Sequence, residues 1–161
     1  MNIVFMGSPA IAVPSLKAIL ASNHKVAGVV SQPDKPAGRG RDLTPPPVAA
    51  FAKEHGLPLF QPDKIRSNAE FLEQLTRLKP DVIAIVAYGK ILPKEILNLP
   101  PHGCVNVHFS LLPKYRGAAP LQWALINGDE ETGVAVFRLN EGVDTGPVFV
   151  QRKVMIHDED N

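Results

Sequence analysis

The sequence predicts an α/β domain built on an open, mostly parallel twisted sheet with flanking helices. Strand-like and helix-like segments alternate along the 161 residues, which is typical of helices packed against a parallel sheet. One segment, residues 81–87 (Asp-Val-Ile-Ala-Ile-Val-Ala), is almost continuously apolar. Such a run predicts a central strand that is covered on both faces.

The N-terminal part of the chain is expected to supply the parallel strands. An apolar run over 2–6 predicts the first strand, and Ser8 followed by Pro9 predicts the N-cap and first position of a helix over 9–21. Further strands are expected over 25–30, 57–60 and 81–87, and further helices over 48–55, 68–78 and 93–97. Residues 31–47 show neither pattern and predict a long polar loop, rich in proline and charge.

The C-terminal part departs from this alternation. A strand is expected over 103–108, a loop over 110–119, a helix over 120–126, and strands over 132–139 and 148–156. Only a glycine-rich connection joins the last two strands, so we expect them to pair antiparallel at an edge. The acidic residues 157–161 look like the first turn of another helix, which predicts a fragment of a longer protein; a short acidic tail is the alternative.

The composition excludes several classes of protein. Hydrophobic residues make up 45% and charged residues 20% of the chain, which is typical of a globular protein rather than a disordered one. The single cysteine, Cys104, excludes an internal disulfide and a zinc site built from cysteines, and we expect no metal. No apolar run approaches the ~18–20 residues of a membrane span, and the N-terminus resembles a strand rather than a targeting segment, so a cytoplasmic location is expected.

Charge is distributed unevenly along the chain. Residues 1–127 hold 14 Lys and Arg against 8 Asp and Glu, a net charge of +6. Residues 128–161 hold 3 and 8, a net charge of −5. This asymmetry favours an anionic partner for the basic part, with an ordinary solvated surface as the alternative.

The turn after the first strand excludes a dinucleotide cofactor. It reads Met6-Gly7-Ser8-Pro9-Ala10 and holds one glycine where a dinucleotide-binding turn needs three in the pattern G-x-G-x-x-G. Without the other glycines the backbone cannot closely approach a pyrophosphate. We therefore expect neither a nicotinamide nor a flavin.

Polar residues inside a predicted strand indicate a functional site. Asn106 and His108 share one face of that strand, about 6.5–7 Å apart along the chain. Near the carboxyl end of a strand they can both reach into one pocket, although a pair of hydrogen-bonded core residues is the alternative. Apolar residues 111–113 in the following loop suit a pocket wall for a flat ligand. Asp144 lies between glycines and is either a third site residue or an ordinary turn residue.

Taken together, these segments resemble the folate-dependent formyltransferase family. The resemblance rests on Asn106-Val107-His108, on Ser110-Leu111-Leu112-Pro113 and on Asp144-Thr145-Gly146. Residues 5–9, 32–40 and 116–120 are similar to members that formylate methionyl-initiator-tRNA. The resemblance covers the whole chain and departs from the family pattern at Phe109, where a small residue is usual. It implies a Rossmann-like fold in which residues 1–161 are the catalytic domain, incomplete at its C-terminus, with the tRNA-binding C-terminal β-barrel domain absent.

The resemblance also implies a reaction and the residues that serve it. The family's catalytic residues match Asn106, His108 and Asp144, which would stabilise charge on the formyl oxygen and handle protons. The formyl donor would be 10-formyltetrahydrofolate and the acceptor the amino group of methionyl-initiator-tRNA, with the enzyme a monomer. The folate pocket would be formed by Val86, Tyr88, Gly89, Ser110, Leu111, Leu112 and Pro113. The tRNA would contact Lys35, Arg39 and Arg41.

Other functions remain open at this point. Related enzymes use the same three residues to formylate glycinamide ribonucleotide or sugar nucleotides, or to hydrolyse formyltetrahydrofolate. The three cationic residues of the 31–47 loop favour a phosphate-bearing macromolecule as the acceptor. A non-catalytic RNA-binding module is disfavoured, because only 6% of the residues are aromatic and no stacking platform is recognisable.

Overall fold

The structure is a computed structural model that describes residues 1–37, 42–157, 159 and 160. It divides into two compact units, Met1–Cys104 and Val105–Asn161, and each is described by itself. Among the described residues, no helix has both the length and the apolar character needed to cross a membrane.

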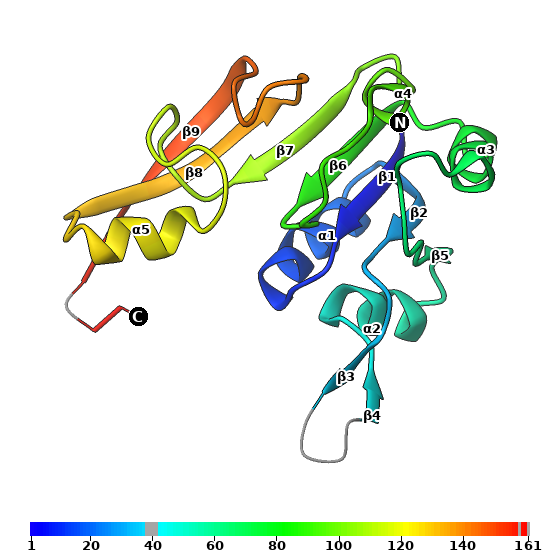
Figure 1. The fold of residues 1–161 in the computed structure, drawn as a ribbon, viewed down its shortest axis with the longest axis horizontal. Helices are drawn as coiled ribbons and strands as arrows, with labels where there is room; N and C mark the ends of the chain where they lie inside the picture. The colour runs from blue at the N-terminus through cyan, green and yellow to red at the C-terminus, as the bar shows by residue number, and fades with distance from the viewer. Residues whose placement is uncertain (38–41, 158, 161) are drawn as a thin grey trace. The chain divides into compact units, whose positions relative to one another are not determined.

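The first unit is built on a parallel sheet. Its strands are β1 (Asn2–Gly7), β2 (Lys25–Val30), β5 (Leu59–Phe60) and β6 (Val82–Val86). Strand β1 lies between β2 and β6 and pairs in parallel with both, and β5 continues the sheet beyond β2 (Figure 1). Val4, Phe5 and Met6 of β1 are fully buried, which explains why this strand reads as an unbroken apolar run. The strands predicted from hydrophobic pattern in this unit are confirmed.

Helices of the first unit follow the predicted order. They are α1 (Val13–Leu20), α2 (Pro47–Glu54), α3 (Ala69–Arg77) and α4 (Lys94–Leu97). Asn68 caps α3, since its side-chain oxygen accepts a hydrogen bond from the Phe71 N–H at 3.0 Å. Gly56 follows α2 with φ +61°, a conformation that favours glycine, as expected for a helix end.

The predicted start of the first helix is wrong. A short 3₁₀ turn, η1 (Ala10–Ala12), follows Pro9, and α1 begins only at Val13. Ser8 caps neither element, because its hydroxyl accepts a hydrogen bond from the Gln32 N–H at 3.1 Å. Ser8 therefore ties the end of β1 to the end of β2. The partly buried N–H of Gln32 needs an acceptor, and the sequence around Ser8 gives no sign of this need.

The predicted loop over 31–47 is also more ordered than expected. It contains a two-stranded antiparallel ribbon, β3 (Lys35–Ala37) and β4 (Asp42–Thr44), in which Lys35 is paired with Thr44. Pro36 argued against a strand here, because proline has no N–H to donate to a sheet. An edge strand tolerates such a residue, and both strands of this ribbon are edges. Residues 38–41 lie outside the described part of the chain.

The second unit holds antiparallel strands. β7 (Cys104–His108) pairs with β8 (Glu131–Arg138), and β8 pairs with β9 (Val148–Met155) (Figure 1). Helix α5 (Pro120–Ile126) lies between β7 and β8 in sequence and packs on β8. The antiparallel arrangement predicted for the last two strands is confirmed. The helical turn predicted over 157–161 falls partly outside the described residues.

Each unit has a buried feature of note. In the second unit, Ala135 and Phe137 of β8 are fully buried and pack with Leu112 and Leu139. In the first unit, the chain's single cysteine, Cys104, is 1% exposed, and its thiol lies 3.6 Å from the Ile96 carbonyl oxygen.

Candidate active site

The last residue of β7, His108, is held through both nitrogens of its ring. The side chain is 6% exposed and meets the Phe137 ring edge-on at 6.3 Å between centroids. Its Nε2 lies 2.8 Å from the Tyr115 carbonyl oxygen, and its Nδ1 lies 3.4 Å from Asp144 Oδ2. A carbonyl oxygen only accepts hydrogen bonds, so Nε2 carries a proton and Nδ1 faces the carboxylate.

Asp144 is positioned by the connection between β8 and β9. Its backbone adopts φ +49°, and its Oδ2 accepts a hydrogen bond from the Gly117 N–H at 2.8 Å. Gly146 has no room for a side chain, because an added Cβ would collide with the Arg138 carbonyl group. The carboxylate therefore faces His108 Nδ1 at 3.4 Å, where the two side chains form an ion pair when the ring is protonated.

Asn106 lies on β7 two residues before His108, so both side chains emerge on the same face of the strand. It is half-buried and paired in register with Phe137 of β8. Within the described part of the chain its side-chain amide has no hydrogen-bond partner, so its N–H groups are available to a ligand. Asn106, His108 and Asp144 thus occur together in the second unit.

The loop after β7 has its own internal support. Ser110 is fully buried and its hydroxyl donates a hydrogen bond to the Lys114 carbonyl at 2.6 Å. Leu112 is 8% exposed, packs on the β8 core and joins Pro113 through a cis peptide bond. Pro113 itself is exposed. The segment predicted as an apolar wall, 111–113, is therefore part of an ordered loop in which Leu112 points into the core.

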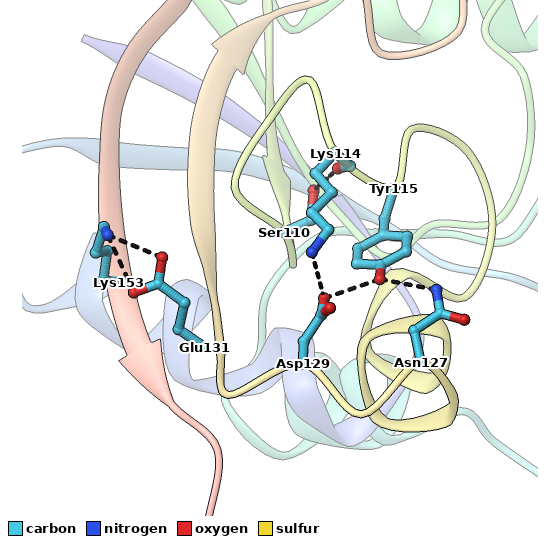
Figure 2. A network of polar contacts seen from close by, with 7 residues as sticks. All are labelled: Ser110, Lys114, Tyr115, Asn127, Asp129, Glu131 and Lys153. Carbon is cyan, nitrogen blue, oxygen red and sulfur yellow. Dashed lines mark hydrogen bonds and ion pairs between the residues drawn. The ribbon is translucent and has the colours of Figure 1, made fainter.

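Four polar side chains stabilise the other end of this loop (Figure 2). The Lys114 Nζ and the Tyr115 hydroxyl donate to the same oxygen of Asp129, Oδ2, at 2.7 and 2.8 Å. The Asn127 amide donates to the Tyr115 hydroxyl at 2.8 Å. The hydrogen bonds from Lys114 and Tyr115 lower the pKa of Asp129, and the bond to Asp129 raises the pKa of Lys114.

The predicted folate residues of the first unit are the last residue of β6, Val86, and the turn residues Tyr88 and Gly89. Val86 and Tyr88 are each 1% exposed, whereas Gly89 is exposed and adopts φ +77°. The Gln32 side chain donates to the Tyr88 carbonyl at 2.9 Å and so holds this turn. The Tyr88 hydroxyl is buried with no hydrogen-bond partner among the described residues, and burial raises the pKa of Tyr88 to about 12.

The predicted tRNA residues are described only in part. Lys35 lies in β3, where its Nζ donates to the Gln32 side-chain oxygen at 3.2 Å. Arg39 and Arg41 lie outside the described residues. A role for all three in binding tRNA stays a prediction.

Comparison with known proteins decides the family. All of the chain, residues 1–161, matches the family model described as formyl transferase. The chain belongs to the formyl transferase family.

Relatives in this family are similar to the chain along its whole length. It is 55% identical over 160 residues to the methionyl-tRNA formyltransferase of Thermodesulfovibrio yellowstonii, covering 99% of this chain and 52% of that protein. It is 52% identical over 162 residues to the methionyl-tRNA formyltransferase of Thermosynechococcus vestitus, covering 100% of this chain and 49% of that protein. The chain therefore spans about half the length of the curated relatives it matches.

Solved structures confirm the predicted fold class of the formyltransferase. A phosphoribosylglycinamide formyltransferase from Bacillus halodurans matches with a TM-score of 0.78 at 25% identity, covering 100% of this chain and 83% of that one. Glycinamide ribonucleotide transformylase 1 from Geobacillus kaustophilus also matches with a TM-score of 0.78, at 28% identity, covering 99% of this chain and 85% of that one. The chain thus has the α/β formyltransferase fold.

Three groups around His108 in the formyltransferase were not predicted from its sequence. They are the Tyr115 carbonyl, the Gly117 N–H and the Asp129 carboxylate. Two of them are backbone groups. Because almost every residue has a backbone N–H and C=O, the sequence does not indicate which of them contacts the site. Asp129 follows the glycine that ends α5 and reads as a turn residue. The run of small residues after Arg116 was the available indication that the backbone there approaches another group closely.

Proposed function

We propose that this chain is the catalytic part of a methionyl-tRNA formyltransferase, which transfers a formyl group from 10-formyltetrahydrofolate to the amino group of methionyl-initiator-tRNA. The observation that carries the proposal is the pairing of the buried His108 with Asp144, with Asn106 on the same strand face as His108. The names of relatives that are 50–55% identical over the chain support this choice of acceptor. The enzyme would act as a monomer in the cytoplasm.

The reaction needs a group that stabilises charge on the formyl oxygen. The acceptor amine attacks the formyl carbon, a C–N bond forms, and the oxygen becomes negatively charged. The amide of Asn106 would donate a hydrogen bond to this oxygen, since no protein group in the described residues occupies it. A donor of this kind contributes about 10²–10³ in rate.

The reaction also needs one proton to change place. The attacking nitrogen loses a proton, the bond between the formyl carbon and the folate nitrogen breaks, and that nitrogen gains a proton. Since Nε2 of His108 is bound to the Tyr115 carbonyl, the proton shared by Nδ1 and Asp144 would be the one that exchanges. The pair would thus act as a relay between the incoming and the leaving nitrogen.

The residues predicted to bind each substrate would hold it as follows. The folate would contact the loop residues Ser110, Leu111, Leu112 and Pro113 and the turn residues Val86, Tyr88 and Gly89. The unpartnered hydroxyl of Tyr88 supports a polar ligand at that turn. The tRNA would contact Lys35, Arg39 and Arg41 and the further domain of the longer relatives, with residues 1–161 as the catalytic domain.

A choice of acceptors tests the proposal. The chain is incubated with 10-formyltetrahydrofolate and, in separate reactions, with methionyl-initiator-tRNA, with glycinamide ribonucleotide or with water alone. We expect formylmethionyl-tRNA as the main product and its loss in Asn106→Ala. Faster formylation of glycinamide ribonucleotide, or release of formate without an acceptor, would overturn the choice of acceptor.

A further inference from the structure

A polar cluster on the loop after β7 carries an inference about His108. It consists of Lys114, Tyr115, Asn127 and Asp129 (Figure 2). We propose that Asp129 is a positioning residue that, through Tyr115, fixes the tautomer and orientation of His108. Its effect on catalysis rests on the proposed function, whereas its effect on the histidine ring does not.

Tyr115 connects the cluster to His108 through two different atoms. Its hydroxyl donates to Asp129 Oδ2 at 2.8 Å, and its backbone carbonyl accepts from His108 Nε2 at the same distance. The side chain of one residue is thus anchored by a carboxylate while its backbone holds the imidazole. Displacing the ring of Tyr115 displaces the carbonyl on which the protonated Nε2 depends.

The backbone of the loop needs such an anchor. Tyr115 has φ +55° and Ala119 has φ +57°, conformations that are unfavourable for residues with a side chain. Contacts made by the side chain must therefore hold Tyr115 in place. The hydroxyl meets this need twice, since it donates to Asp129 and accepts from Asn127 at 2.8 Å.

Asp129 is itself fixed and charged. Its side chain is 17% exposed, and the ammonium group of Lys114 lies 2.7 Å from the oxygen that binds Tyr115. A carboxylate is a stronger acceptor for a phenol hydroxyl than a neutral oxygen. The ion pair thus strengthens the contact that anchors the loop.

Correct anchoring decides which nitrogen of His108 can exchange a proton. With Nε2–H bound to the carbonyl, Nδ1 faces Asp144 and the Nε2 position is unavailable for proton transfer. If the carbonyl moves away, the ring can protonate at either nitrogen and lose its alignment with the carboxylate. A shift of about 1 Å in a reacting group lowers rates by up to about 10²-fold.

Four variants of the chain test the inference. Asp129→Ala removes the anchor, and Tyr115→Phe removes only the hydroxyl while keeping the ring. Asp129→Asn keeps an oxygen that accepts the hydroxyl. Glu131→Gln is the matched control, because Glu131 forms a comparable pair with Lys153 at 2.8 Å that touches neither the loop nor His108 (Figure 2).

The readout is the ¹⁵N NMR spectrum of the His108 ring, assigned by its disappearance in His108→Ala. In the unmodified chain we expect the Nε2 signal of an N–H nitrogen, because this atom faces the Tyr115 carbonyl oxygen. In Asp129→Ala and Tyr115→Phe we expect both ring nitrogens to shift toward the average of two tautomers. In Asp129→Asn and Glu131→Gln we expect shifts close to those of the unmodified chain. If Asp129→Ala does not fold, as judged by its circular dichroism, Tyr115→Phe decides.

Ring shifts that stay unchanged in folded Tyr115→Phe and Asp129→Ala would overturn the inference, as would equal changes in Glu131→Gln. In formyl transfer we expect kcat to fall about 10-fold in the first two variants and to change more than KM, because neither variant removes a residue proposed to contact a substrate. Absence of formyl transfer by the unmodified chain would refute the proposed function. The NMR comparison would still decide the positioning role, so the two failures are distinguishable.

Discussion

The side chain of His108 illustrates how a few atoms define the site. Its two nitrogens have different partners, a backbone carbonyl on one side and a carboxylate on the other. Because a carbonyl oxygen can only accept a hydrogen bond, the Tyr115 contact places a proton on Nε2 before any substrate binds. Asn106, by contrast, has a side chain that no described residue engages, which suits a group that acts only on a bound ligand.

Removing the charge of Asp144 tests this assignment. Asp144→Asn keeps the size of the side chain and an oxygen for the Gly117 N–H but removes the negative charge that faces His108. We expect kcat for formyl transfer to fall by about 10²–10⁴ with folding intact. Asn106→Ala should lower kcat by about 10²–10³ for a different reason, the loss of a donor to the oxyanion.

The double variant is the control for that prediction. If the groups act as a unit, Asn106→Ala combined with Asp144→Asn should be much less impaired than the product of the two single effects. Activity that declines only in step with the amount of folded protein would mean that these residues are structural. Thermal melting of each variant, measured beside kcat, separates the two cases.

Tyr88 predicts an unusual alkaline behaviour. Burial raises the pKa of its hydroxyl to about 12, so the folded state holds this proton above the ordinary range of the unfolded state. Between about pH 10 and 12 the unfolded chain has already released it, and the free energy of unfolding should fall by up to about 2–3 kcal/mol. The stability is fully present below about pH 10. The measurement is denaturant unfolding as a function of pH.

Tyr88→Phe is the matched variant for this titration. It should lose the alkaline decline and be as stable as the unmodified chain at neutral pH, because the hydroxyl it removes has no partner in the described residues. Tyr115→Phe should keep the decline, as Tyr115 is the only other tyrosine in the sequence. An unchanged alkaline decline in Tyr88→Phe would refute the assignment.

At the level of elements, the connection between β8 and β9 determines where Asp144 lies. Gly146→Ala should destabilise the chain by about 1–3 kcal/mol, because its Cβ would collide with the Arg138 carbonyl. Formyl transfer should also fall, since Asp144 lies only two residues away. Gly56→Ala is the control, with φ +61° but no atom near an added Cβ. It should cost about 1 kcal/mol and leave kcat unchanged; equal kcat in both variants would refute the prediction.

Sequence pattern predicted those elements whose causes are local. The strands β1, β2 and β9 and the helix α5 follow from apolar runs and their bounding turns. The start of α1 was mispredicted because the Ser8 hydroxyl accepts a hydrogen bond from the Gln32 N–H, 24 residues away. The β3–β4 ribbon was missed because both strands are only three residues long and β3 contains a proline.

In the candidate site, too, features with a local cause were predicted and those that depend on distant residues were not. Asn106 and His108 could be paired from the alternation of side chains along one strand, and Asp144 from the family resemblance. The contacts that orient His108 could not be predicted, because the Tyr115 carbonyl and the Gly117 N–H are backbone atoms brought close by the loop. Asp129 acts across 14 residues, which no local pattern reveals.

Charge is the property of the whole molecule that bears on tRNA. The first 127 residues carry a net charge of +6 and the remainder −5, so an anionic partner is favoured by the first part only. Arg39→Ala should weaken tRNA binding with little effect on folate binding. It should also lower the slope of log K against log salt concentration by about one for each lost phosphate contact.

Lys64→Ala serves as the control for that experiment, since it removes an exposed cation elsewhere in the first part of the chain. Its salt slope should match that of the unmodified chain. Equal slopes for Arg39→Ala and the unmodified chain would contradict a phosphate contact at this residue. Filter binding at several salt concentrations measures all three.

Cys104 makes the molecule convenient for fluorescence work. It is the only cysteine in the sequence, and at 1% exposure its thiol is shielded from maleimide reagents in the folded state. A cysteine introduced at an exposed position such as Trp123 would therefore be labelled selectively, with no native thiol to remove first. A dye attached at position 123 would report on the unit that contains it, and Cys104 in β7 would stay unmodified.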